Sequence, residues 1–332
     1  MPMFLTQSPA QGPGSFLRAP VITDLDALQA DVAILGIPYG DPYSIDEVTN
    51  DQTRAPDAIR ALSDRFCRGR ERWDFDLGGP ILAGRDVRIV DCGNVIADPR
   101  ALTGHYARAE QAARKIFASG ALLITLGGDH GVPIPVFRAL DGKGPITLVH
   151  IDAHLDWRDE VNGVREGYSS PIRRASEMPH FNAIFQIGLR GQGSARAEEV
   201  GAARAYGAHL IPAHELHEIG MRAVLDRIPD GGRYYLTIDA DGVDPAVMPA
   251  VMAPAPGGVT YDQMLTLIHG LVRKGRVVGM DIVEIAPSLD VNRITCLTAG
   301  RLIVNFIGSA ARAGYFDRAA EQPRRERVSA AD

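Results

Sequence analysis

Three short segments of this sequence combine aspartate and histidine at spacings that suit metal coordination. They read Gly-Gly-Asp-His at 127–130, His-Ile-Asp-Ala-His-Leu-Asp at 150–156 and Asp-Ala-Asp-Gly-Val-Asp-Pro at 239–245. Six oxygen and nitrogen ligands are more than one ion needs, so we expect a two-metal hydrolytic centre. The candidate ligands are His130, Asp152, His154, Asp156, Asp239 and Asp241.

The spacing within the segments favours a shared site. Side chains two residues apart in an extended chain point to the same side. Asp152, His154 and Asp156 have this spacing, and so do Asp239 and Asp241. Each segment can therefore present its ligands as a group. A single Asp-x-Asp is common in turns, but a buried cluster of carboxylates would destabilise the fold without a cation, so the joint occurrence indicates metal.

The ligand set also restricts the metal. Four carboxylates and two imidazoles, with no sulfur, suit Mn²⁺, and less strongly Ni²⁺, Fe²⁺ or Co²⁺, better than structural zinc. Four aspartates balance the charge of two divalent ions lying about 3.5–4 Å apart. Coordination would bring the pKa of a bridging water towards about 7, which makes a nucleophile at physiological pH.

Each metal-binding segment follows an apolar run that predicts a buried strand. Strands are expected at 31–37, 87–92, 121–126, 145–151, 182–187, 208–212, 234–239 and 277–283. Helical patterns lie between them, for example at 101–118, 195–206 and 261–272. This alternation predicts a mostly parallel sheet with helices on both faces. Open sheets of this kind bind ligands at the carboxyl ends of their strands, where the three segments begin.

The composition is that of an ordinary globular protein. The chain has 332 residues, of which 45% are hydrophobic and 23% charged, and its net charge of −6 argues against a nucleic-acid partner. We find no apolar run expected to span a membrane and no secretory signal. Three widely spaced cysteines fit a reducing compartment, so a cytoplasmic location is expected. One domain is expected at 20–317, between an irregular arm at 1–19 and a flexible tail at 318–332.

The motifs resemble those of the ureohydrolase superfamily, the arginase and agmatinase group. The likeness runs from Ile34-Leu-Gly-Ile-Pro-Tyr-Gly40 to Asp281-Ile-Val-Glu-Ile-Ala-Pro287, and segments 186–190 and 256–260 look like the agmatinase branch. The resemblance implies a three-layer α/β/α fold with about eight mostly parallel strands. It also implies hydrolysis of a guanidino compound to urea and an amine, by a homo-oligomer such as a trimer or hexamer.

The resemblance further implies how the ligands divide between two ions. His154 and Asp241 would hold one ion, with Asp152 and Asp239 bridging; the other would be held by His130, Asp152, Asp156 and Asp239. Hydroxide held by the metals would then attack the guanidinium carbon, and the leaving amine would take up a proton.

A further carboxylate, Glu284, matches the family glutamate that binds the guanidinium. A carboxylate suits this role because it accepts two parallel N–H bonds from a planar cation.

Three departures from the family pattern indicate a reshaped substrate pocket. Tyr168 stands where many relatives have a proton-shuttling histidine, and tyrosine is a poor shuttle near neutrality. Asp156 or another group would then move the proton, unless the leaving group needs less help. Arg158, preceded by Trp157, occupies the position at which the arginase branch has an asparagine that holds the amino-acid tail. Trp157 either stacks on a flat cation, and so binds substrate, or packs in the interior. The segments 48–60 and 248–254 also differ, the latter being apolar.

We therefore expect a small or methylated guanidine or a biguanide as substrate, for example guanidine, dimethylguanidine or metformin, with Mn²⁺ or Ni²⁺. The alternatives are agmatine or a guanidino acid such as 4-guanidinobutyrate, whose carboxylate Arg158 could pair. A third possibility is a subunit that needs a related, active partner in a hetero-oligomer. Deacetylation of an acyl-polyamine is disfavoured, because that chemistry uses one zinc and fewer ligands.

Overall fold

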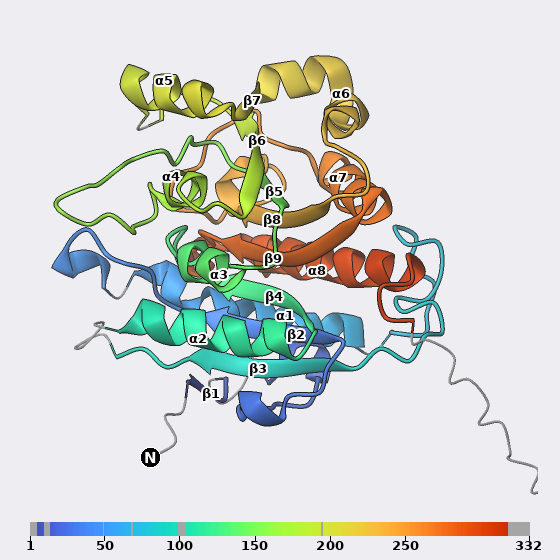
Figure 1. Cartoon of the computed structure of the whole chain (residues 1–332). Coiled ribbons are helices and arrows are strands. Elements are labelled where there is room, and N and C mark those ends of the chain that lie inside the picture. The colour runs from blue at the N-terminus through green and yellow to red at the C-terminus, as the bar shows by residue number, and fades with distance from the viewer. Residues whose placement is uncertain are drawn as a thin grey trace, which may run out of the picture.

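The computed structural model describes residues 5–9, 14–48, 50–67, 69–98, 104–193 and 195–317. Within these ranges a nine-stranded sheet has the order β1-β3-β2-β4-β9-β8-β5-β6-β7 (Figure 1). The strands are β1 (Thr6–Gln7), β2 (Val32–Ile37), β3 (Ile89–Val95), β4 (Leu122–Gly127), β5 (Ile146–Ile151), β6 (Phe181–Leu189), β7 (His209–Pro212), β8 (Arg233–Asp239) and β9 (Arg276–Val283). The predicted fold class is confirmed, and the eight predicted strands are all present.

The ninth strand lies in the segment that we expected to be irregular. β1 pairs antiparallel with β3, whereas all pairs among the other eight strands are parallel. Leu5, Phe16 and Leu17 from the same segment are buried. Two residues of strand are too short to show alternation, so only their apolar neighbours could have indicated that this segment packs. The expected tail at 318–332 lies outside the described residues.

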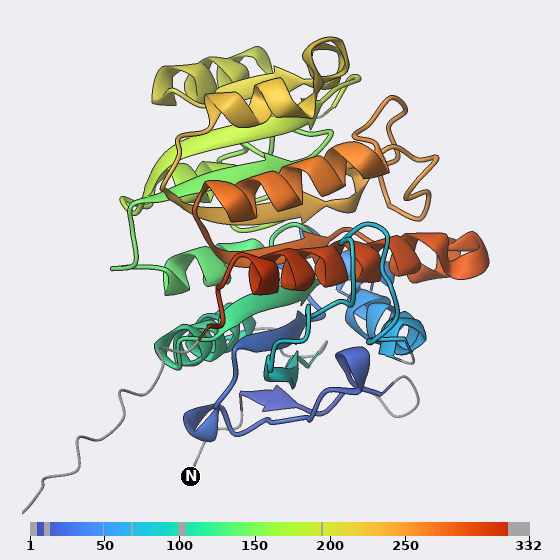
Figure 2. The same ribbon diagram turned by 90° about the vertical axis from the view of Figure 1, so that its right-hand side faces the viewer.

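Helices cover both faces of the sheet. One apolar core lies beneath α1, α6, α7 and α8, and the second lies beneath α2, α3 and α5. Figure 2 looks onto the face covered by α7 and α8. The helices are α1 (Ala55–Cys67), α2 (His105–Ala118), α3 (Pro133–Ala139), α4 (Pro171–Ser176), α5 (Ala197–Tyr206), α6 (Ala213–Arg227), α7 (Tyr261–Lys274) and α8 (Ile294–Arg312).

The helix α8 corrects one expectation. With the turn before it, α8 forms a helical segment Val291–Arg312 of 22 residues with a mean hydropathy of 1.4, long and apolar enough to cross a membrane by these criteria alone. However, 83% of its apolar window is buried inside the protein. It packs against α1 and α7, so its hydropathy is that of a core helix.

The sheet order brings the predicted site together. β4, β9, β8 and β5 are consecutive neighbours in the middle of the sheet, and all four run in the same direction. Their carboxyl ends therefore lie side by side at one edge. The three metal-binding segments and Glu284 follow these four strands.

Candidate metal centre

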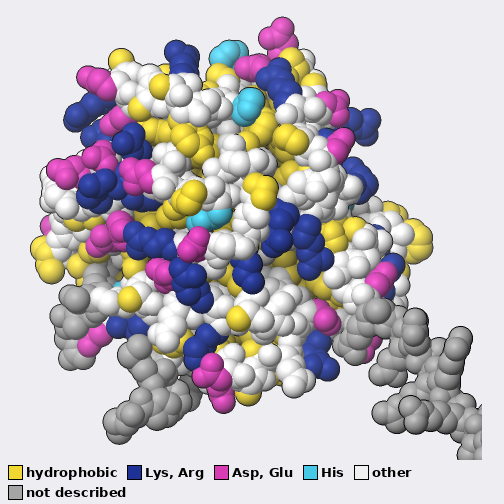
Figure 3. All heavy atoms as spheres, in the orientation of Figure 1, with side chains coloured by type: hydrophobic (Ala, Val, Ile, Leu, Met, Phe, Trp, Pro, Cys, Tyr) yellow, Lys and Arg dark blue, Asp and Glu magenta, His cyan; other side chains and the backbone are white. Residues whose placement is uncertain are grey.

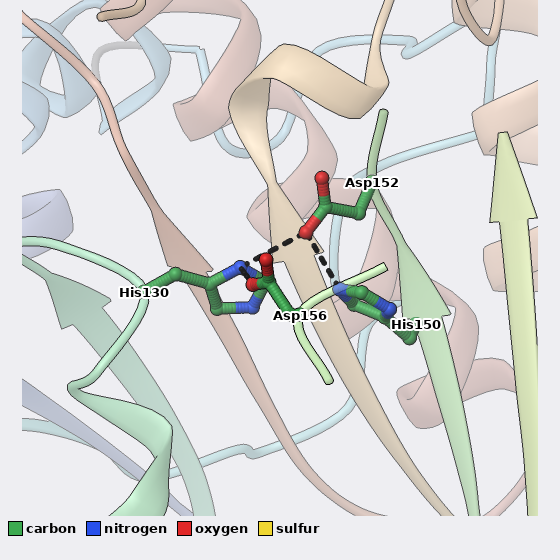
Figure 4. Close-up of side chains that lie close together, drawn as sticks. All are labelled: His130, His150, Asp152 and Asp156. Carbon is green, nitrogen blue, oxygen red and sulfur yellow. Dashed lines mark hydrogen bonds and ion pairs between the residues drawn. The ribbon is translucent and has the colours of Figure 1, made fainter. Parts of the chain in front are cut away.

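The predicted ligands meet at this edge of the sheet, and Figure 4 shows three of them, His130, Asp152 and Asp156, together with His150. His130 follows β4, Asp152 directly follows β5, and Asp239 is the last residue of β8. The Nδ1 atom of His130 lies 3.1 Å from Asp152 Oδ2, 3.0 Å from Asp156 Oδ2 and 3.0 Å from Asp239 Oδ2. Ligand atoms about 2.1 Å from a shared cation and at right angles to each other are about 3.0 Å apart. Each of the three oxygens thus lies at the distance from Nδ1 that is expected for two ligands of one ion.

We had expected the ligands to converge because they alternate along an extended chain, but the structure shows a different cause. β5 ends at Ile151, and Asp156 adopts a left-handed backbone with φ of 51°. Asp241 lies in a short 3-10 turn, Ala240–Gly242. A side chain on Gly242 would collide with the backbone of Asp152, its Cβ being 2.5 Å from the Asp152 nitrogen. Tight turns after the strands, and not alternation, therefore aim these ligands.

The hydrogen bonds of His130 assign its tautomer. Asp281 has a carboxylate, which accepts hydrogen bonds, so the Thr237 hydroxyl 2.7 Å away donates to it. Thr237 then accepts from Nε2–H of His130, at 3.2 Å. Nδ1 is left with a lone pair that faces three carboxylate oxygens. Acceptors that face one another in the interior require a cation between them, so the donor set fits a metal ion.

Without metal, these groups perturb one another strongly. Burial, with the charge of Asp152, raises the pKa of Asp156 to about 7. Burial, with the charges of Asp241 and Asp152, raises the pKa of Asp239 well above its ordinary value. For His130, burial lowers the pKa, but the surrounding carboxylates outweigh it and raise the pKa well above the ordinary value. A proton and a metal ion thus compete for the same place at Nδ1.

A second group of ligands shares Asp152 with the first. His154 Nδ1 lies 3.1 Å from Asp241 Oδ2 and 3.4 Å from Asp152 Oδ1, whereas the other Asp152 oxygen faces His130. Hydrogen bonds to Asp152 and Asp241 raise the pKa of His154 to about 12. The two oxygens of Asp152 thus face different histidines, as a bridging ligand requires. The bridging roles of Asp152 and Asp239 both stay predictions, since Asp152 Oδ1 also accepts from the His154 backbone nitrogen at 2.6 Å and Asp239 Oδ1 accepts from the Asp241 backbone nitrogen at 2.8 Å.

Sequence reasoning missed the role of His150. Its Nε2 lies 2.8 Å from Asp152 Oδ2, and the Gln186 amide nitrogen lies 3.1 Å from its Nδ1 (Figure 4). If Gln186 donates to Nδ1, His150 carries its proton on Nε2 and donates to Asp152. We therefore regard His150 as a residue that orients a ligand, although its atoms lie within ligand distance. Its position two residues before Asp152, in the same series of alternate residues as His154 and Asp156, could have indicated that His150 belongs to the site.

Another residue that holds the site is Arg190, at the end of β6. Its guanidinium donates to the carbonyls of Asp241, Gly242 and Val243 and to those of Ala255 and Pro256. The loop that carries Asp241 is therefore fixed at both ends by one side chain.

A cavity of about 500 Å³ opens beside the ligands. Besides His154, Asp156, Asp239 and Asp241, the described residues that line it are Tyr43, Glu47, Asn50, Gln52, Arg158, Val161, Tyr168, Ser169, Met252, Ala253 and Glu284. Glu284 is 8% exposed, and its Oε1 accepts from the backbone nitrogen of His130 at 2.8 Å. The predicted guanidinium-binding carboxylate thus lies next to the ligands.

The aromatic wall of the cavity consists of Tyr43 and Tyr168. Their ring centroids are 4.5 Å apart, and the Tyr43 hydroxyl accepts from the Ser169 backbone nitrogen at 2.9 Å. Burial and the negative charge of Glu47 raise the pKa of Tyr168. Its phenol is therefore neutral near pH 7 and can donate a hydrogen bond but cannot accept a proton.

Of the two roles considered for Trp157, stacking on a substrate and packing in the interior, the structure shows packing. Trp157 is 3% exposed, packs in the core with its ring 5.8 Å from that of Tyr206, and is not among the described residues that line the cavity. Arg158 does line the cavity, but its Nε lies 2.9 Å from Glu199 Oε1. The left-handed conformation of Asp156 turns the chain so that Trp157 faces the interior.

Comparisons with known proteins show what the chain is similar to. Residues 30–308 match the sequence model of the arginase family. The chain is 32% identical to guanidinopropionase from Pseudomonas aeruginosa over 305 residues, covering 88% of this chain and 90% of the relative. It is 30% identical to guanidinobutyrase from the same organism, covering 89% and 92%. A solved structure described as a hypothetical agmatinase from Burkholderia thailandensis aligns with a TM-score of 0.76 and 27% identity, covering 94% and 96%.

Proposed function

Because this chain belongs to the arginase family and is a hydrolase of guanidino compounds, we propose that its substrate is a small or methylated guanidine or a biguanide. Guanidine, dimethylguanidine and metformin are examples. The reaction would cleave a C–N bond to give urea, or a substituted urea, and an amine. Two divalent ions, Mn²⁺ or Ni²⁺, would be held by His130, Asp152, His154, Asp156, Asp239 and Asp241.

The charge distribution of the cavity carries this proposal. Glu284 and Glu47 line it, and both attract a cation. Arg158, the one Lys or Arg among the described lining residues, is ion-paired with Glu199 at 2.9 Å. Tyr43, Tyr168 and the apolar Met252 and Ala253 supply surface for methyl groups. A compact cation without an acidic tail fits these walls best.

The residues around the cavity would divide the chemistry among them. Bound divalent ions would supply an activated water and stabilise negative charge on the substrate. Glu284 would bind the guanidinium by two parallel N–H bonds and fix its plane relative to the ligands. The neutral Tyr168 would donate a hydrogen bond to the substrate. Asp156 would accept the proton that the attacking water loses and pass it to the leaving amine, which otherwise departs as a poor leaving group.

Guanidino acids are the second candidate substrates, because the two Pseudomonas aeruginosa relatives bear the names guanidinopropionase and guanidinobutyrase. The substrate carboxylate would have to take the place of Glu199 at Arg158. If so, Arg158→Ala would raise KM for guanidino acids and leave KM for tail-less guanidines unchanged. Agmatine is a further alternative, with its ammonium near Glu47.

We also propose that the chain acts in the cytoplasm as a homo-oligomer, with a hetero-oligomer of related subunits as the alternative. Nucleic acid is not a proposed partner. On the face seen in Figure 3, basic and acidic side chains are interspersed, so this face offers no continuous basic surface.

Urea release by the purified protein tests the proposal. The protein would be loaded separately with Mn²⁺ and Ni²⁺ and given guanidine, dimethylguanidine, metformin, agmatine, 4-guanidinobutyrate and arginine. Fastest turnover of a tail-less compound is the expected result. Preference for agmatine or the guanidino acid would overturn the substrate assignment but not the reaction. No turnover with two metals bound would favour the need for a partner subunit.

A further inference from the structure

The guanidinium-binding carboxylate has a neighbour that the family resemblance does not explain. Gln52 lies in the 3-10 turn Asp51–Arg54, is 5% exposed and lines the cavity. Its Nε2 lies 2.9 Å from Glu284 Oε2, and the other Glu284 oxygen accepts from the His130 backbone nitrogen at 2.8 Å. The carboxylate is therefore held at both oxygens by protein donors, and its plane is fixed.

The orientation of the Gln52 amide follows from this contact. A carboxylate accepts and does not donate, so the amide nitrogen must face Glu284. The Oε1 atom consequently points away from Glu284, and it finds no donor among the described residues. A buried acceptor without a partner is costly, which indicates a ligand that supplies the missing N–H.

The turn that carries Gln52 is tied to the same side of the site as Glu284. Asp51 Oδ2 accepts from both the backbone nitrogen and the hydroxyl of Ser288, each at 2.8 Å. Ser288 lies four residues beyond Glu284 in the chain. The side chain of Asn50 accepts from the Thr53 nitrogen and caps the turn. Gln52 and Glu284 are thus held in one fixed relationship.

We propose that Gln52 positions Glu284 and also binds the substrate, accepting a guanidino N–H with Oε1. Glu284 has one free lone pair on each oxygen for two substrate N–H groups. Gln52 supplies a third, neutral acceptor beside them, so the site binds a guanidino group that still carries an N–H on the adjacent nitrogen. This inference rests on the proposed guanidino hydrolysis but not on which guanidino compound is hydrolysed.

The first test is Gln52→Met, which keeps the length of the side chain and removes both its donor and its acceptor. Arg54→Met is the matched control, because Arg54 is exposed in the same turn. Each variant would be assayed on the compound that the wild type hydrolyses fastest. We expect kcat/KM of Gln52→Met to fall about 10- to 100-fold, mostly through KM, with bound metal and Tm unchanged. The control should stay within about twofold.

The second test is Gln52→Glu, which distinguishes a hydrogen bond from mere packing. Ionised, the new carboxylate repels Glu284; protonated, it can again donate to Glu284 and accept from the substrate. Burial and the like charge raise the pKa of the new carboxyl above its usual value of about 4.3. Activity relative to wild type should therefore recover as the pH falls, which Gln52→Met cannot reproduce.

Several results would overturn the inference. If Gln52→Met kept the wild-type kcat/KM, the contacts of Gln52 would not contribute to catalysis. If Arg54→Met lost as much kcat/KM as Gln52→Met, the loss would come from disturbance of the turn and not from Gln52. Loss of metal or of Tm in Gln52→Met, with no acid recovery in Gln52→Glu, would leave Gln52 a structural residue. If the wild type hydrolysed no guanidino compound, both this inference and the proposed function would be wrong. If the wild type were active and Gln52→Met were equally active, this inference alone would be wrong.

Discussion

The hydroxyl of Thr237 in β8 donates to Asp281 in the adjacent strand β9 across 2.7 Å. Because that hydroxyl has a single hydrogen, it meets Nε2 of His130 as an acceptor. The tautomer of His130, and with it the direction of its lone pair, is set by two residues that lie behind the site. This relationship holds the ligand ready for a cation.

Replacement of Thr237 by valine should weaken metal binding. Valine has the same shape but can neither accept from His130 nor donate to Asp281. We expect metal affinity to fall about 10- to 100-fold, the usual effect of losing a group that orients a ligand. Titration of the metal-free protein with Mn²⁺ measures it. Thr147→Val, at another buried strand threonine, is the control and should bind metal as the wild type does.

Metal removal should destabilise the protein, and more so at higher pH. In the metal-free state burial raises the pKa of Asp156 to about 7, so its protonated form is favoured by folding and stability falls as pH rises from about 4 to about 7. The pKa of His154 is raised to about 12 by its two carboxylate partners, so its contribution is present below about 6.5 and is lost as pH rises towards 12. Both effects have the same sign.

Bound metal replaces the protons in these contacts. The difference in Tm between metal-loaded and chelator-treated protein should therefore widen between pH 5.5 and pH 8, as scanning calorimetry can measure. A difference that is constant over this range would contradict the placement of the ions on Asp156 and His154.

Tyr168 offers a test of proton transfer. Burial and nearby negative charge raise the pKa of its phenol, so it should cause no ionisation step in the wild-type pH–rate profile near neutrality. Tyr168→His should introduce one near pH 6.5, the usual pKa of histidine. Tyr168→Phe should lower kcat about 10-fold if the phenol donates to the substrate. Equal kcat values in the wild type and in Tyr168→Phe would exclude that donation.

Trp157 should matter for stability and not for substrate binding. Because its side chain is buried in the core, Trp157→Ala should lower the free energy of unfolding by about 3–5 kcal/mol, as denaturant titration can measure. Trp157→Phe, which keeps an aromatic ring there, should leave KM within about twofold. A large rise in KM without loss of stability would favour the other role considered for Trp157, stacking on a flat cation.

The sequence was sufficient to predict eight of the nine described strands and the clustering of the candidate ligands, because both depend on local patterns. Apolar runs predicted β2 to β9, and side chains at strand ends must meet when the strands are parallel neighbours. The orientation of Trp157 could not be predicted, since it depends on the left-handed backbone of Asp156. Gln52 could not be found either, because it reaches Glu284 from a turn that is 232 residues away in the chain.

The guanidinium of Arg190 joins the two ends of the loop that leaves the metal site at residues 241–243 and returns at 255–256. The metal-binding end is thereby anchored independently of the residues in between. Met252 and Ala253 on the cavity wall belong to this intervening stretch. If this stretch contacts the substrate as we propose, substitutions in it would change specificity while Arg190 keeps both ends of the loop, and with them Asp241, in place, so that new specificities would arise without rebuilding the proposed metal centre.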